Sequence, residues 1–150
     1  MDELVLVLDR ERHALERLLF RLLGARGALA DEQSRFLAWA AEDLERAAAA
    51  VDEAAVRRDR WTTEGSLRGW VETACEPYAT LLDEHRSKLA GLATDIETSL
   101  RAARRLAVSG RAETQLGSET LERAIALTGY DAVLTATDGV QMAGLLDFLA

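Results

Sequence analysis

The chain has 150 residues, 49% of them hydrophobic, and a formal net charge of −8 at pH 7. This length is enough for one domain with a buried core that needs neither disulfides nor metal ions to hold it together. The negative charge argues against nucleic acid as a partner, because binding to phosphate groups requires a clustered positive face. Ala, Leu, Glu and Arg dominate and there is one Pro, a composition that favours helices.

Residues 2–29 are predicted to form a first long helix with Asp2 as its N-cap. Its apolar residues recur at spacings of four and three, which is typical of a helix that packs along one stripe. Glu11 fills the single polar slot of this stripe, and Asp31 is expected to cap the next helix. The stripe consists of Leu4, Leu8, Leu15, Leu18 and Leu22.

A second long helix is predicted over residues 32–63, with an Ala-rich middle that would let a neighbouring helix approach closely. Arg58 interrupts its stripe, and Trp39 lies off it. Its apolar positions are Leu37, Ala40, Leu44, Ala47, Val51, Ala54 and Trp61. A short connector helix follows, from Ser66 as N-cap to about residue 74, and we expect Trp61 and Trp70 to pack where it meets the long helices.

The third long helix is predicted to start at residues 76–77, where Pro suits the first turn, and to end at Gly110. His85 lies on its stripe, where we expect a partly buried histidine that is hydrogen-bonded to a neighbour. Cys75, the single cysteine, is expected to be a small buried apolar residue. The stripe consists of Tyr78, Leu82, His85, Leu89, Leu92, Ile96, Ser99, Ala103 and Leu106.

The last forty residues differ in character, with 2 basic and 6 acidic side chains. Residues 111–117 are polar and are predicted to be a linker, and residues 118–128 can form a capped helix. Residues 140–150 are apolar nearly all round, with two polar positions. Because such a segment is not stable alone in water, it must cover a groove or meet a partner.

Catalytic and metal-binding patterns are not found. Di-iron bundles require Glu-x-x-His pairs, whereas Arg10 and Leu82 stand three positions before His13 and His85. The chain also lacks a Gly-x-Ser-x-Gly motif and a glycine-rich phosphate loop. Arginines of the first helix alternate with acids at helical spacing, which is typical of a solvated face. We therefore expect no metal, no cofactor and no enzymatic activity.

Residues 11–23 read ERHALERLLFRLL, and residues 76–86 read EPYATLLDEHR. These two strings resemble the FlgN-type flagellar export chaperones, in particular their actinobacterial branch. The order of the motifs, the helix lengths and the connector match over about residues 3–110, and residues 130–132 resemble a Tyr-Asp-Ala stretch in the tails of relatives. The resemblance implies an ATP-independent cytoplasmic chaperone that holds hook–filament junction proteins and delivers them to the flagellar export gate. Its association with the membrane would be only indirect.

A cytoplasmic location also fits the N-terminal residues. The apolar run at residues 4–8 is short and follows Asp2 and Glu3, whereas a signal peptide has basic residues before a longer apolar stretch. No run approaches the roughly 20 apolar residues that a membrane-spanning helix needs.

The expected fold is all-α: an open antiparallel coiled-coil bundle of three long helices with a short connector helix and a C-terminal helical tail. Residues 1–110 would form the bundle and residues 111–150 the linker and amphipathic tail, either within the same domain or mobile. In the family the C-terminal region contacts the substrate and the gate. Our candidates for partner binding are Leu121, Ile125, Tyr130, Val133, Leu134, Met142, Leu145, Leu146 and Phe148.

Two alternatives remain open at this point. The tail could be a fourth helix that packs on the protein's own core, and a client could then displace it. The whole chain could instead be a homo-oligomeric coiled-coil adaptor or structural protein, a homodimer in which the stripe of the first helix pairs with a second copy.

Overall fold

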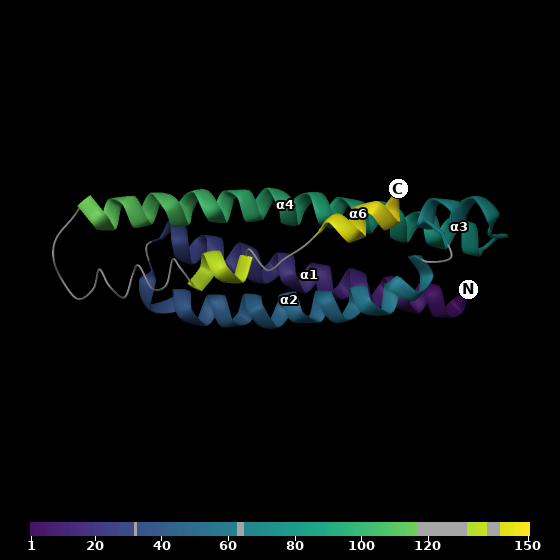
Figure 1. The fold of residues 1–150 in the computed structure, drawn as a ribbon, viewed down its shortest axis with the longest axis horizontal. Helices are drawn as coiled ribbons and strands as arrows, with labels where there is room; N and C mark the ends of the chain where they lie inside the picture. The colour runs from purple at the N-terminus through teal and green to yellow at the C-terminus, as the bar shows by residue number, and fades with distance from the viewer. Residues whose placement is uncertain (32, 63–64, 117–131, 138–141) are drawn as a thin grey trace.

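The computed structural model describes residues 1–31, 33–62, 65–116, 132–137 and 142–150. Every regular element in these ranges is a helix, which confirms the all-α prediction (Figure 1). A further helical stretch covers residues 132–137. The named helices are α1 (Asp2–Ala30), α2 (Ser34–Thr62), α3 (Leu67–Thr73), α4 (Tyr78–Leu116) and α6 (Ala143–Leu149).

Helix α1 is the centre of the bundle, with α2 packed on one side and α4 on the other (Figure 1). Helices α1 and α2 are antiparallel, as their ion pairs Arg21–Asp43 and Glu11–Arg58 show, because one residue number rises while the other falls. Helices α1 and α4 run parallel, since Asp2 bonds Tyr78 near one end and Arg26 bonds Ser99 near the other. Helix α3 connects α2 to α4 and packs against α4.

The predicted stripe of α1 forms the core of the bundle. Its five leucines are at most 1% exposed, because α2 and α4 cover them from two sides. Burying one leucine side chain contributes about 1.5–3 kcal/mol, so this stripe is the main source of cohesion between the long helices. On α4 the buried stripe only partly follows the prediction. Ala93, Leu100 and Ala107 are buried as well, whereas Tyr78, Leu92 and Leu106 are half-buried.

The connector follows the prediction closely. Ser66 caps α3, and its hydroxyl accepts a hydrogen bond from the backbone N–H of Gly69 at 3.2 Å. Trp61 and Trp70 pack edge to face with 6.0 Å between their ring centroids, as expected for the junction of α2 with the connector. Gly65 precedes the cap with a φ of 152°, a conformation that L side chains rarely adopt.

Several local predictions were wrong. Asp2 is the first residue of α1 and not its N-cap, which is Met1, and no side chain caps this end of the helix. Helix α4 continues through Gly110 to Leu116, because a glycine inside a helix costs only about 1 kcal/mol and good helix formers follow it. Asp31 is the C-cap of α1, where its N–H bonds the Gly27 carbonyl, and does not cap α2. Cys75 is exposed because the connector ends before it and α4 starts after it, so no helix face buries it.

Candidate docking groove beneath the C-terminal tail

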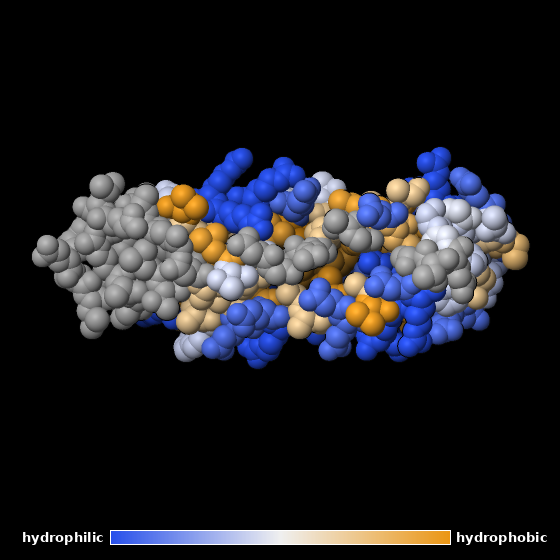
Figure 2. Space-filling model, in the orientation of Figure 1, coloured by the Kyte–Doolittle hydropathy of each residue, from blue (hydrophilic) through white to orange (hydrophobic). Residues whose placement is uncertain are grey.

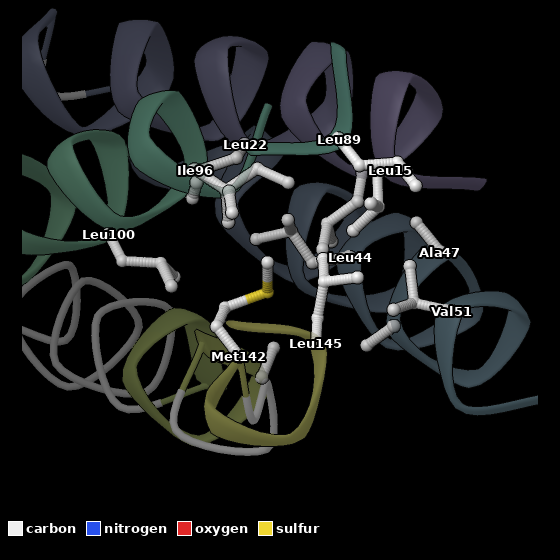
Figure 3. Close-up of a cluster of buried hydrophobic side chains, with 14 of the residues drawn as sticks. Leu15, Leu22, Leu44, Ala47, Val51, Leu89, Ile96, Leu100, Met142 and Leu145 are labelled. Carbon is white, nitrogen blue, oxygen red and sulfur yellow. The ribbon is translucent and has the colours of Figure 1, made fainter. Parts of the chain in front are cut away.

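Helices α2 and α4 form the two walls of an apolar groove, and α1 forms its floor. Figure 3 shows side chains from all three helices converging on the space beneath the tail. These side chains are buried, and those labelled are Leu15 and Leu22 from α1, Leu44, Ala47 and Val51 from α2, and Leu89, Ile96 and Leu100 from α4. The Ala-rich middle of α2 presents short side chains here, which leaves room for a further helix.

The tail occupies this groove. Residues 132–137 and α6 lie over the face between α2 and α4 (Figure 1), and α6 packs against α4 and α3. Met142 and Leu145 point from the tail into the groove (Figure 3). On this face apolar side chains gather along the centre, with polar side chains along both edges (Figure 2). The buried residues of the tail are Val133, Ala136, Thr137, Met142, Leu145, Phe148 and Leu149.

The candidate partner-binding residues therefore fall into three groups. Val133, Met142, Leu145 and Phe148 are buried against the chain's own bundle, and Leu134 packs partly against it. Leu146 is 45% exposed on the outer side of α6. Leu121, Ile125 and Tyr130 lie outside the described residues. Of the two arrangements considered for the tail, the described part has that of a fourth helical layer on the core.

A charged pair lies at the edge of the groove. Glu11 of α1 is 1% exposed and Arg58 of α2 is 3% exposed, and Arg58 Nη1 donates a hydrogen bond to Glu11 Oε1. The sequence marks each residue as a polar interruption of an apolar stripe, but it does not show that the two residues meet. They meet because α1 and α2 are antiparallel and these two positions lie at the same level along the bundle.

This pair is only partly satisfied. Glu11 Oε2 and Arg58 Nε have no hydrogen-bond partner among the described residues. Burial raises the pKa of Glu11 to about 7, although the neighbouring Arg58 guanidinium acts in the opposite direction. Asp59 also raises the pKa of Glu11, and its own carboxylate lies 3.7 Å from Arg58 at the surface. A buried pair of this kind adds little net stability, because the cost of removing the two charges from water offsets their attraction.

Helix α6 covers the charged pair. The Arg58 guanidinium carbon lies 5.5 Å from the centroid of the Phe148 ring, within the range of a cation–π interaction. A pocket of about 220 Å³ remains beside the pair, with Met142 and Leu145 on the tail side and Val51 on the α2 side. The tail thus seals the groove without filling it completely.

A second pocket of about 370 Å³ lies where the first turns of α1 and α4 meet. Asp2 and Tyr78 close one side of it through a hydrogen bond of 2.5 Å from the phenol to the carboxylate. His85 lines it and is half-buried, and burial lowers the pKa of the imidazole. Among the described residues its Nδ1 has no hydrogen-bond partner, so the expected hydrogen bond is not found.

The described side chains contain no group of three or more His, Cys, Asp or Glu residues that could hold a metal ion. Within the same ranges, no helix combines the length and the apolar character that a membrane crossing requires. Comparisons of the chain with protein-family models, with curated proteins and with solved structures found no match. The fold and the site together define an all-helical protein whose long helices form a groove that its own C-terminal tail occupies.

Proposed function

We propose that the protein is an ATP-independent chaperone that binds helical segments of secretion clients in the groove between α2 and α4. The observation that carries this proposal is the occupation of the groove by the tail, whose Met142, Leu145 and Phe148 side chains are buried in the core cluster. A groove that accepts one short amphipathic helix in this way can accept another of similar pattern.

The physical requirements of such a chaperone are modest. A client that is not yet assembled exposes apolar helical stripes, and these stripes associate with one another unless another surface covers them. An apolar groove with polar edges provides that surface and needs no chemical step (Figure 2). Because α6 is short and docks on the outside of the bundle, a client can replace it while α1, α2 and α4 stay packed.

The identity of the clients comes from the resemblance to the FlgN-type export chaperones. From this resemblance we infer that the clients are the flagellar hook–filament junction proteins. We also infer that the protein acts in the cytoplasm and delivers them to the export gate. In this proposal the client contacts the groove walls, and the buried tail residues are the occupant that the client displaces. The tail residues are available for contacts with the client or the gate only after α6 has left the groove.

Size-exclusion chromatography with mass determination tests the proposal. The purified full chain is mixed with a purified hook–filament junction protein, and a helical protein of similar size that takes no part in flagellar assembly is the control. We expect a soluble complex of fixed stoichiometry with the junction protein and none with the control. If no hook–filament junction protein forms a complex, the proposed clients are wrong.

One observation favours the alternative of a homo-oligomeric adaptor. Phe20 is 68% exposed and Trp39 is 66% exposed, on the outer faces of α1 and α2. The α1 stripe itself cannot form a dimer interface, because α2 and α4 already bury it. The adaptor would therefore pair through the outer faces of α1 and α2 and would stay dimeric on dilution. The chaperone proposal requires instead that the groove opens when α6 leaves. Mass determination over a dilution series, with Trp39→Ser as the interface variant, separates the two.

A further inference from the structure

A charged pair lies beneath the C-terminal tail, at the edge of the apolar groove. We propose that Glu11 and Arg58 fix the register of the helix that occupies the groove and select a helix with an aromatic ring over the Arg58 guanidinium. The partner class is an amphipathic helix with the apolar spacing of α6. The inference rests on the proposed function only in taking this groove as the place where a client helix binds.

Helix α6 shows which pattern the groove accepts. Leu145 and Phe148 of α6 and its N-cap residue Met142 follow one another at three-residue spacing, which places them on the same side of the tail, and all three are buried. Met142 and Leu145 point among apolar side chains (Figure 3), whereas Phe148 lies over Arg58 at 5.5 Å. Met142 and Leu145 thus pack among apolar side chains and line the pocket beside the charged pair, whereas Phe148 contacts the Arg58 guanidinium directly.

That charge makes the third position selective. An aromatic ring attracts a guanidinium through its π electrons, and an aliphatic side chain in the same place offers no such attraction. If the helix shifted by one residue so that Leu149 replaced Phe148 near Arg58, the guanidinium would keep its hydrogen bond to Glu11 but lose the ring. The shifted register is disfavoured because it gives up the cation–π attraction. Single polar positions fix the register of coiled coils in the same way.

Helix α6 is an incomplete occupant of this site. Among the described residues Glu11 Oε2 and Arg58 Nε have no hydrogen-bond partner, and a pocket of about 220 Å³ remains beside Met142 and Leu145. A client helix that fills this pocket or bonds these atoms binds the groove better than α6 does. This difference in binding shifts the equilibrium from the docked tail toward the bound client helix.

Amide hydrogen exchange of residues 143–149 in the full chain tests the inference. Phe148→Leu removes the ring but keeps an apolar side chain, and the double substitution F148L/L149F moves the ring by one position without changing the composition. Both are made in the natural chain and in E11Q/R58M, in which the pair carries no charge. Because these amides exchange when α6 leaves the groove, their protection reports its docking equilibrium.

We expect both changes at Phe148 to lower the protection of α6 about tenfold in the natural chain, and by less than about twofold in E11Q/R58M. A second uncharged background, E11M/R58M, covers the case in which E11Q/R58M does not fold, since apolar residues often replace a buried pair without loss of stability. Circular dichroism shows which backgrounds are folded.

Two results overturn the inference. One is an equal loss of protection in the charged and uncharged backgrounds, which would make Phe148 an ordinary apolar anchor. The other is full amide protection of α6 in F148L/L149F, which would show that the groove does not distinguish one register of the helix from another. The experiment contains no client, so its failure leaves the chromatographic test of client binding unaffected, and a failure of that test leaves the register result unaffected.

Discussion

Glu11 and Arg58 are the residues whose burial departs most from what their chemistry favours. A glutamate and an arginine at 1% and 3% exposure are found inside a bundle only when each compensates the other. Because Arg58 also contacts Phe148, the pair connects three parts of the site, namely α1, α2 and the tail. Substitutions at this pair therefore report on both the bundle and the groove.

Replacing Arg58 alone is expected to be far more destabilising than replacing its neighbour on the sequence. Arg58→Met leaves the Glu11 carboxylate buried without a cation, and at about pH 8 this should lower the free energy of unfolding by about 3 kcal/mol or more. Arg57→Met removes only an exposed ion pair with Glu53, so it should change that free energy by less than about 0.5 kcal/mol. Urea denaturation of both variants provides the measurement. Similar losses in the two variants would mean that the buried pair is not special.

The ionisation of Glu11 gives the stability a specific pH dependence. Burial raises the pKa of Glu11 from an ordinary value of 4.5 to about 7, so the folded chain holds this proton more tightly than the unfolded chain does. The stability that this proton contributes is complete below the unfolded pKa and is lost as the pH rises through the folded pKa. Relative to Glu11→Gln, the wild-type free energy of unfolding should fall by at most about 3 kcal/mol over this window.

Urea titrations of the two proteins across the same pH range measure this difference, since all other titrating groups are shared. If the two curves stay parallel, Glu11 has an ordinary pKa in the folded chain, and the pair is better solvated than its exposure indicates.

The sequence identifies both members of the pair but not the pair itself. Glu11 and Arg58 are visible as polar positions in apolar stripes, because a stripe has a strict period that one polar residue interrupts. Their contact depends on the relative level of two antiparallel helices, which the turn near Asp31 and the packing of leucines set together. The turn and the leucine packing depend on contacts between residues far apart in the chain, and the periodicity of one helix does not reveal such contacts.

At the scale of elements, α6 has one buried and one exposed leucine side by side. Leu145 is 4% exposed in the groove, and Leu146 is 45% exposed on the outer side. Leu145→Asp places a charge in an apolar site and should undock α6. The rate of amide exchange over residues 143–149 should then rise by about tenfold or more. Leu146→Asp is the matched control and should leave this exchange nearly unchanged.

Hydrogen exchange with mass spectrometry distinguishes the two leucine variants directly. Equal effects of the two substitutions would mean that α6 docks with a different face, and protection retained in Leu145→Asp would mean that the groove tolerates a charge.

Most elements could be predicted from their local pattern, and the errors occur where a longer-range term decides. The stripe of α1 and the cap at Ser66 depend on residues a few positions apart, so the sequence contains them. The end of α4 does not coincide with Gly110, because one glycine is a weak stop signal when helix formers follow it. The tail's need for an apolar partner surface was predictable, but the surface that it covers is formed by three separate helices.

On the scale of the whole molecule, the three long helices lie side by side with α1 in the middle (Figure 1), so α2 and α4 leave one face open for a further layer. The tail provides that layer in the free chain. A client that uses the same face must compete with α6, and its apparent affinity is reduced by the fraction of molecules in which the tail is docked. In the proposed function, the docked tail therefore controls access to the groove.

Calorimetric titration of one junction protein into wild type, Leu145→Asp and Leu146→Asp tests this claim most directly. The account predicts that Leu145→Asp binds the client more tightly than wild type, by about tenfold or more, because the groove is already open. Leu146→Asp should match wild type, since its side chain does not face the groove. Weaker binding by Leu145→Asp than by wild type would contradict the account, because it would mean that the docked tail holds the client and the groove does not.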